Sequence, residues 1–269
     1  MLRTRLLTAA ILIPVVIGFT YLGGLPFLAL VVVVTTLAEI EFCLLISQRA
    51  FHGVHCFGIA LVWLLVLDAA VQAYSLTAPG LAAILAFSLA WLVFRHAHGG
   101  TSDWTGAIAG ALYLGLYGSY FVRLRGLPAR GLWVTLLGAT VIVIADSTAM
   151  FAGMAWGRHK LAPSISPGKT WEGYLGGIIA GALTGIFFAW LGTFVVGHTG
   201  TVSSSDGLTL GTLIATVAPL GDLFVSVVKR EAGVKDSGQL LPGHGGMLDR
   251  VDSALWAGVL AYYYVIWFV

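Results

Sequence analysis

The sequence predicts an all-α, polytopic integral membrane protein with about nine transmembrane helices. Of its 269 residues, 58% are hydrophobic and only 10% are charged, whereas soluble globular domains carry about 25% charged residues. Glycine contributes 35 residues, and small residues allow membrane helices to pack closely. This composition excludes a soluble enzyme, a disordered chain and a nucleic-acid-binding protein, and the net charge of +2 indicates no strongly anionic macromolecular partner.

Nine apolar segments are long enough to cross a bilayer, which requires about 20 mostly apolar residues per helix. The expected spans are residues 6–22, 25–47, 56–76, 79–98, 104–122, 132–154, 172–196, 207–228 and 251–269. We divide them into an N-terminal region of transmembrane helices, residues 1–130, and a C-terminal transmembrane region, residues 131–269. The C-terminal region contains two charged loops, residues 155–171 and 229–250.

Basic residues predict the orientation, because cytoplasmic loops carry an excess of Lys and Arg. With nine spans and the N-terminus inside, eleven basic residues lie on the cytoplasmic side and three on the other side. The eleven are Arg3, Arg5, Arg49, Arg95, Arg158, Lys160, Lys169, Lys229, Arg230, Lys235 and Arg250. The three exceptions, Arg123, Arg125 and Arg130, leave open that one early span is miscounted. Both charged loops are expected to face the cytoplasm.

Charged residues are concentrated in two segments, 146–172 and 222–252. Asp146 and Asp222 interrupt apolar runs, and a carboxylate inside a span costs about 2.5–3.5 kcal/mol and usually indicates a functional site. Other acidic residues inside or near spans, Glu39, Glu41 and Asp68, have no motif around them. For these three, a functional role and a structural role as partner of a polar group stay equally open.

The second charged segment places acidic residues on two helices. Asp222, Ser226 and Lys229 are spaced i, i+4 and i+7, so they share one helix face. Asp249 and Asp252 are spaced i and i+3 at the start of the last span, so they also share a face. Mg²⁺ prefers one or two carboxylates together with substrate phosphates. The pattern predicts a Mg²⁺–polyphosphate site, and the alternative is an ordinary charged loop.

A glycine-rich loop, which includes Gly245 and Gly246, connects these two helices. Glycine-rich backbone approaches a ligand closely and can direct N–H groups at an anion. The basic residues around it are Lys229, Arg230, Lys235 and Arg250. His244 could donate to a phosphate, act as an acid or make an ordinary hydrogen bond.

The first charged segment ends in Gly-Lys-Thr, but it is not a phosphate-binding P-loop. Pro163 stands where that motif needs glycine, and the preceding segment is a predicted membrane helix rather than a strand. We expect a basic loop in which Ser166 and Lys169 contact phosphate. Thr170 is expected to cap the following helix, with Glu172 in its first turn, and a helix N-terminus attracts phosphate. The alternative is a plain basic cytoplasmic loop.

The stretch from Ser226 to Asp252 resembles the signature of phosphatidate cytidylyltransferases, also called CDP-diacylglycerol synthases. It reads SVVKR, four further residues, then KDSGQLLPGHGGMLDRVD, and it follows the family pattern throughout. Residues 145–173, with Asp146, Ser166-Pro167 and Lys169-Thr170, are similar to the family's other recurring segment. The first 130 residues match the family only in being hydrophobic spans.

The resemblance implies an enzyme that converts CTP and phosphatidate to CDP-diacylglycerol and pyrophosphate in phospholipid biosynthesis, with Mg²⁺ required. It also implies a second, monovalent cation such as K⁺ beside the Mg²⁺. The protein would be a multi-pass enzyme of the inner (cytoplasmic) cell membrane, a homodimer in the bilayer, with its active site facing the cytoplasm and no nucleic-acid partner. Residues 131–269 become the expected catalytic region.

The resemblance implies that Asp222 and Asp249 hold metal, and the other roles are our mechanistic hypothesis. The expected metal ligands are Asp222, Asp249 and Asp146, with Asp146 and Asp252 placed either as ligands or as residues that orient the ligands. The expected catalytic set is Asp222, Ser226, Lys229, Arg230, Lys235, Asp236, His244, Asp249, Arg250 and Asp252. The expected substrate-binding residues are Ser166, Lys169, Thr170, Lys229, Arg230, Gly245 and Gly246.

Two other functions remain as alternatives. A transporter or channel would also contain many spans and intramembrane acids, but its paired broken helices in two matching halves are not visible here. Another membrane CDP-lipid transferase, a CDP-alcohol phosphotransferase, would carry the motif D-G-x2-A-R-x8-G-x3-D-x3-D. We do not find that motif in the sequence.

Overall fold

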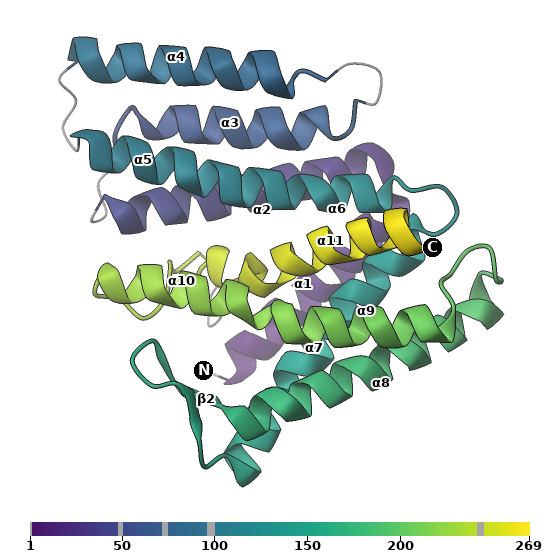
Figure 1. Ribbon diagram of the computed structural model, residues 1–269. Coiled ribbons are helices and arrows are strands. Elements are labelled where there is room, and N and C mark those ends of the chain that lie inside the picture. The colour runs from purple at the N-terminus through teal and green to yellow at the C-terminus, as the bar shows by residue number, and fades with distance from the viewer. Residues whose placement is uncertain (1, 48–50, 72–74, 96–99, 241–244) are drawn as a thin grey trace. The chain divides into compact units, whose positions relative to one another are not determined.

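The computed structural model describes the chain except residues 1, 48–50, 72–74, 96–99 and 241–244 (Figure 1). The described residues form two compact units, each built from separate parts of the sequence. The first unit comprises Met1–Arg123 and Val228–Val251, and the second comprises Leu124–Val227 and Asp252–Val269. The chain passes from one unit to the other inside three helices, which are α6 (Tyr117–Arg125), α10 (Pro219–Glu231) and α11 (Leu248–Phe268).

The first unit is helical. Its N-terminal elements are α1 (Leu2–Leu22), α2 (Gly24–Ile46), α3 (His55–Asp68), α4 (Thr77–Arg95), α5 (Gly100–Ala111), the π-helical turn η1 (Leu112–Leu116) and α6, which ends in the second unit (Tyr117–Arg125). Helices α2, α3 and α5 pack on one another, and buried apolar side chains such as Phe27, Leu61 and Val62 form their core. The unit is completed by the end of α10, the following loop and the first turn of α11.

The second unit contains a three-helix layer and a short hairpin. Its elements are α7 (Gly131–Trp156), β1 (Lys160–Ala162), β2 (Ser166–Thr170), α8 (Trp171–Val195), α9 (Ser204–Val217), the first part of α10 and most of α11. Helices α8 and α9 are in close contact because glycines face each other. A Cβ on Gly185 would meet the backbone oxygen of Gly207, so only glycine allows this approach.

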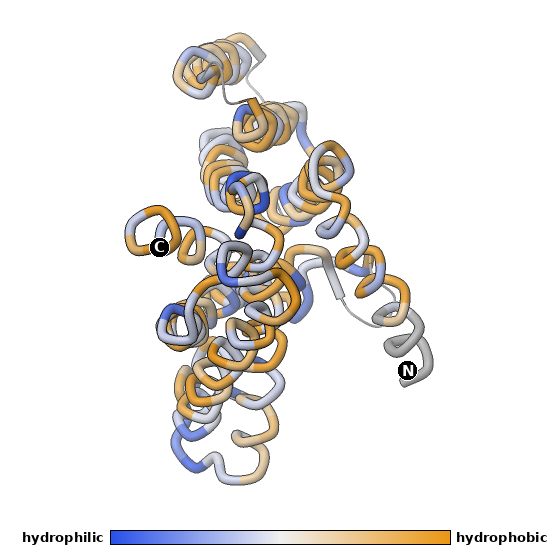
Figure 2. Tube along the Cα trace, turned by 90° about the vertical axis from the view of Figure 1, so that its right-hand side faces the viewer, coloured by the Kyte–Doolittle hydropathy of each residue, from blue (hydrophilic) through white to orange (hydrophobic). Residues whose placement is uncertain are grey.

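Helix α8 has two different faces. Its buried face repeats small residues every four positions, as in Gly177, Gly181 and Gly185. Two positions along, Ile179, Leu183 and Phe187 expose large apolar side chains. Such an exposed apolar face suits lipid, and hydrophobic residues recur along the helices in Figure 2. The expected all-α, polytopic membrane fold is confirmed.

Seven described helical segments are long and apolar enough to cross a membrane. They are Gly24–Ile46, Thr77–Phe94, Gly100–Arg125, Gly131–Trp156, Trp171–Val195, Ser204–Glu231 and Leu248–Phe268. Two further apolar helices, Ala10–Leu22 and His55–Asp68, are shorter. Each expected span contains helix among its described residues, but the number nine stays a prediction, as does the division of the chain at residue 130.

Three local expectations need correction. The expected span 56–76 is too long, because α3 ends at Asp68 and the Asp68 carboxylate accepts hydrogen bonds from Leu76 N and Thr77 Oγ1 before α4. The expected span 207–228 lies within the candidate span Ser204–Glu231, but this segment is not one continuous helix. Helix α9 ends at Val217 and α10 begins at Pro219, since proline is not accommodated in a helix interior. The expected loop 155–171 contains an antiparallel hairpin in which Lys160 pairs with Thr170.

Loop 229–250 is also shorter than expected. Helix α10 continues to Glu231, and α11 begins at Leu248. Lys229 and Asp249, which the sequence placed in or beside this loop, therefore lie on helical turns at its two ends. A helical turn fixes the backbone from which a side chain projects. The side chains of Lys229 and Asp249 contact each other.

Candidate functional site

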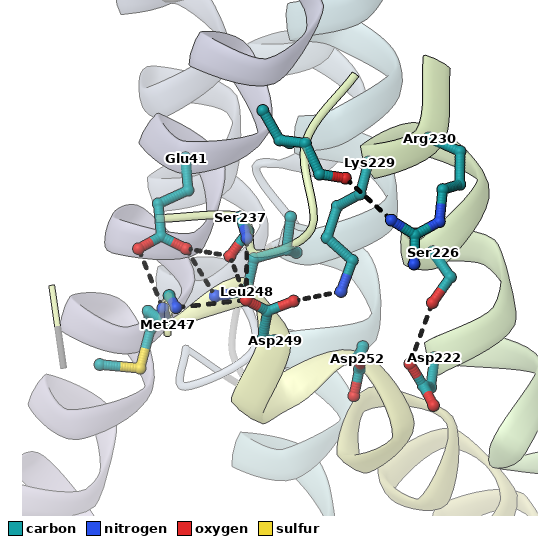
Figure 3. Close-up of polar contacts among 12 residues, drawn as sticks. Glu41, Asp222, Ser226, Lys229, Arg230, Ser237, Met247, Leu248, Asp249 and Asp252 are labelled. Carbon is teal, nitrogen blue, oxygen red and sulfur yellow. Dashed lines mark hydrogen bonds and ion pairs between the residues drawn. The ribbon is translucent and has the colours of Figure 1, made fainter. Parts of the chain in front are cut away.

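Asp249 is the centre of a polar cluster in the first unit, formed with Lys229, Ser237 and Gly246, which we call the Asp249 cluster (Figure 3). Lys229 Nζ donates to Asp249 Oδ1 over 2.5 Å. Asp249 Oδ2 accepts from Ser237 N (2.8 Å), Ser237 Oγ (3.0 Å) and Gly246 N (3.2 Å). Only 11% of the Lys229 side chain and 8% of the Asp249 side chain are exposed. This ion pair is buried, and both oxygens of its carboxylate accept hydrogen bonds.

A second carboxylate, that of Glu41 on α2, contacts the same loop. One Glu41 oxygen accepts from Met247 N (2.9 Å), and the other accepts from Leu248 N (2.9 Å) and Ser237 Oγ (2.8 Å). Ser237 Oγ thus lies within hydrogen-bond distance of both Glu41 and Asp249 (Figure 3). In the sequence, Glu41 is recognisable only as an acidic residue in an apolar span. Its partner Ser237 lies 196 residues further along the chain, so the contact could not be predicted from local sequence.

The loop glycines have a specific role here. Gly245 has a φ of 79°, which other residues rarely adopt. A Cβ on Gly246 would meet Ser237 Oγ and a Glu41 oxygen, so the backbone lies directly against these side chains. The N–H of Gly246 points at a carboxylate of the protein itself. Binding of substrate phosphate by Gly245 and Gly246 stays a prediction.

The other predicted residues of this loop lie at the surface of the first unit. Arg230 Nη1 donates to Val234 O over 3.2 Å, which holds the chain just after α10. Lys235, Asp236 and Arg250 are exposed. Contact of Lys235 and Arg250 with phosphate and the catalytic role of Asp236 stay predictions, and His244 lies outside the described residues.

Asp222 is the centre of a different cluster in the second unit, formed with Asp146, Lys169 and Ser226, which we call the Asp222 cluster. Lys169 Nζ lies 2.6 Å from Asp222 Oδ2. Ser226 Oγ donates to Asp222 Oδ1 over 3.3 Å (Figure 3). Asp146 on α7 is close enough to interact electrostatically with both Lys169 and Asp222. The two charged segments of the sequence therefore meet within the second unit.

The hairpin positions Lys169 at the end of β2. Thr170 is the N-cap of α8, and its side chain accepts from Gly173 N over 3.2 Å, as predicted. Glu172 in the first turn accepts from Arg158 N (3.1 Å) and shares a hydrogen bond with His159 Nδ1 (2.6 Å). These bonds tie both ends of the hairpin to the start of α8. Ser166, at the start of β2, is half-buried.

Asp252 belongs to the interior of the second unit. It is 6% exposed. A Cβ on Gly221 would collide with the Asp252 backbone oxygen, so α10 and α11 approach closely at this point. Its predicted role beside a metal is untested.

The Asp222 cluster offers carboxylate oxygens, the type of ligand that Mg²⁺ prefers, and binding of Mg²⁺ there stays a prediction. Two carboxylates, those of Asp146 and Asp222, interact with one lysine ammonium, so the cluster already accommodates a positive charge. Hard cations such as Mg²⁺ and K⁺ bind oxygen ligands of this kind. At Asp249, Oδ2 already accepts hydrogen bonds from Ser237 and Gly246, whereas Oδ1 accepts one from Lys229, so a metal ion at Oδ1 would lie beside the Lys229 ammonium group.

Among the described residues, one other group combines potential metal ligands: His52, His55 and Asp103 in the first unit. His52 Nδ1 lies 2.5 Å from Asp103 Oδ2, and His52 N donates to His55 Nδ1 over 3.0 Å. These atoms bind one another, and the group joins the start of α3 to the start of α5.

Comparison with known proteins identifies the family. A sequence model described as "Cytidylyltransferase family" matches residues 3–268. A phosphatidate cytidylyltransferase of Synechocystis is 33% identical over 290 residues, covering 97% of this chain and 96% of its own. The protein of the same name from Bacillus subtilis is 31% identical, with 97% of each chain covered. That from Haemophilus influenzae is 44% identical over 53% of this chain and 48% of its own. This helical membrane protein therefore belongs to the cytidylyltransferase family, and it is a nucleotidyltransferase.

Proposed function

We propose that the protein transfers the cytidylyl group of CTP to phosphatidate, which yields CDP-diacylglycerol and pyrophosphate. The family, the names of relatives that match along the whole chain and the signature at residues 226–252 all support this reaction. One structural observation carries most weight. The Lys169–Asp222 ion pair joins the two charged segments into one cluster of acids and a base, which suits the binding of a cation and an anionic phosphate.

The reaction needs positioning and charge neutralisation. A phosphatidate phosphate oxygen attacks the α-phosphorus of CTP in line, and the bond to pyrophosphate breaks. Phosphoryl-type transfers of this kind depend little on a covalent protein nucleophile. Phosphatidate is already anionic near neutral pH, so the reaction requires no dedicated general base. Lys169, Lys229 and the exposed Arg230 are the basic groups that we assign to the phosphates.

Asp222 and Asp146 would hold Mg²⁺, and Asp249 is the third candidate ligand. When bound there, the ion would neutralise phosphate oxygens and so favour departure of pyrophosphate. Lys169 competes with any cation for Asp222, and a phosphate oxygen is the alternative partner of its ammonium group. Ser226 orients the Asp222 carboxylate through its hydroxyl group. A monovalent cation such as K⁺ could use the same type of oxygen ligands.

The membrane setting fits a reaction between a lipid and a soluble nucleotide. The acyl chains of phosphatidate stay in hydrocarbon, while its phosphate must reach CTP from water. We therefore place the protein in the inner membrane with the charged loops toward the cytoplasm, and we propose that it works as a homodimer.

The test is a reconstituted assay with purified protein, radiolabelled CTP, phosphatidate and Mg²⁺. We expect a labelled CDP-lipid and pyrophosphate in equal amounts, and no product with diacylglycerol in place of phosphatidate or after chelation of Mg²⁺. Absence of a CDP-lipid, or ion flux without turnover, would contradict the proposal. Product formation that resists chelation would contradict the metal assignment alone.

A further inference from the structure

We infer that Glu41 is a positioning residue for the Asp249 cluster, so that the N-terminal part of the chain contributes to the active site. This inference rests on the proposed function for its catalytic consequence. The geometry stands by itself, because Glu41 is 7% exposed and accepts three hydrogen bonds from Ser237, Met247 and Leu248.

The first of these contacts concerns the beginning of α11. The initial N–H groups of a helix have no acceptor inside the helix, and negative charge is favourable at this end. Glu41 supplies that acceptor from another helix: its carboxylate binds the N–H of Met247 and the N–H of Leu248, the residue where α11 begins. Asp249 is the next residue, so Glu41 fixes the turn from which the Asp249 side chain projects.

The second contact concerns Ser237. Its hydroxyl group has one proton and lies 2.8 Å from Glu41 and 3.0 Å from Asp249. It can donate to only one of the two carboxylates at a time. Two negative charges therefore adjoin one hydroxyl group, and Lys229 and the backbone N–H groups offset their repulsion. The charge on Glu41 is consequently linked to the hydrogen bonding of Asp249.

The packing around Glu41 agrees with such a role. A Cβ added to Gly238 or to Gly246 would meet the Glu41 carboxylate. The two glycines of the signature thus bring the loop backbone against this side chain. An amide in place of the carboxylate would turn an NH₂ group toward at least one N–H or O–H donor.

Hydrogen exchange measures the positioning directly. In the full-length protein, Glu41→Gln should accelerate exchange of the Met247 and Leu248 amides by about tenfold, because the acceptor of these two N–H groups is weakened. Peptides from α8 and α9 in the second unit should be unchanged. The matched control is Glu39→Gln, two residues earlier on α2. Glu39 is fully buried and accepts a hydrogen bond from Cys43 Sγ over 3.2 Å, and it makes no hydrogen bond to the described residues of the loop. It should leave the loop amides unchanged.

Kinetics measure the consequence. We expect Glu41→Gln to lower kcat by about 10- to 100-fold, which is the loss expected for one or two charge-assisted hydrogen bonds. KM for CTP should change less than about threefold, since the role is to position groups for the transition state rather than to bind CTP. Glu39→Gln should retain kcat within about threefold.

A second variant keeps the inference falsifiable if Glu41→Gln folds poorly. Ser237→Ala removes the hydroxyl group shared by both carboxylates, and it should also speed exchange at residues 245–248 and lower kcat at constant KM. Unchanged exchange in both variants, or faster exchange with normal kcat, would overturn the inference. If the wild-type protein has no cytidylyltransferase activity, the proposed function is overturned instead. The exchange data would still decide whether Glu41 holds the loop.

Discussion

Asp249 and Asp222 are each paired with a lysine at nearly the same distance, yet their surroundings differ. The Asp249 side chain is 8% exposed, and its two oxygens accept hydrogen bonds from Lys229, two backbone N–H groups and a hydroxyl group. The Asp222 side chain is 35% exposed and contacts one lysine and one hydroxyl group. The first carboxylate organises a loop, whereas the second is open to exchange of its cation.

The energetic consequence follows from burial. Breaking a buried ion pair by removing one partner costs about 3–5 kcal/mol, because the other charge remains buried without compensation. Exposed pairs contribute only about 0–1 kcal/mol, since water and salt screen them. Two acids with similar lysine partners should therefore differ in their importance for folding while both matter for turnover.

The largest effect is expected for Asp249→Asn. This change leaves Lys229 buried without a carboxylate and turns an amide toward the loop N–H groups, so we expect turnover to be lost and the free energy of unfolding to fall by about 3 kcal/mol. Thermal unfolding and CDP-lipid formation measure the two effects. A double variant, Lys229→Met with Asp249→Leu, should recover part of the lost stability without activity, because no charge stays buried while two loop N–H groups lose their acceptor. Full activity of Asp249→Asn would show that the Asp249 carboxylate has no role in catalysis.

An intermediate effect is expected for Asp222→Asn. Turnover at a fixed Mg²⁺ concentration should fall about 100-fold, and the Mg²⁺ concentration for half-maximal activity should rise about tenfold, because one charged ligand is lost. The free energy of unfolding should change by less than about 1 kcal/mol. A Mg²⁺ titration and a melting curve provide the measurement. A loss of stability equal to that of Asp249→Asn would refute the distinction between the two acids.

The smallest effect is expected for Thr170→Ala, which removes the N-cap of α8 beside Lys169. Loss of a threonine cap costs about 1 kcal/mol, and the loosened hairpin should raise KM for one substrate a few-fold. Thr184→Ala is the control in the same helix, because Thr184 Oγ1 only bonds Ala180 O within α8. Equal destabilisation by both changes would show that the cap at Thr170 has no special role.

The sequence predicted features that depend on local order. Apolar segments predicted the helices, and the pattern Thr170–x–Glu172 predicted the start of α8 with its cap. The spacing of Asp222 and Ser226 predicted their common helix face, and their side chains are in contact. These are properties of neighbours along one helix, so composition and periodicity suffice.

The features that were missed depend on contacts between distant segments. Glu41 meets the loop only after α2 and the C-terminal part of the chain have folded together, and an isolated acid in an apolar span does not indicate its partner. The hairpin was missed because three- and five-residue strands give too little alternation to recognise. Similarly, Asp68 ends α3 through a bond to Thr77 that span length alone could not reveal.

The distance along the chain between Glu41 and Ser237 has a consequence for biosynthesis. The ribosome makes Ser237 196 residues after Glu41, a delay of about 10–40 s at about 5–20 residues per second. Throughout this period, the nascent chain contains α2 with a carboxylate whose three donors do not yet exist. Until the last helix emerges, that carboxylate needs another hydrogen-bond partner, and water at the membrane surface is one that can serve.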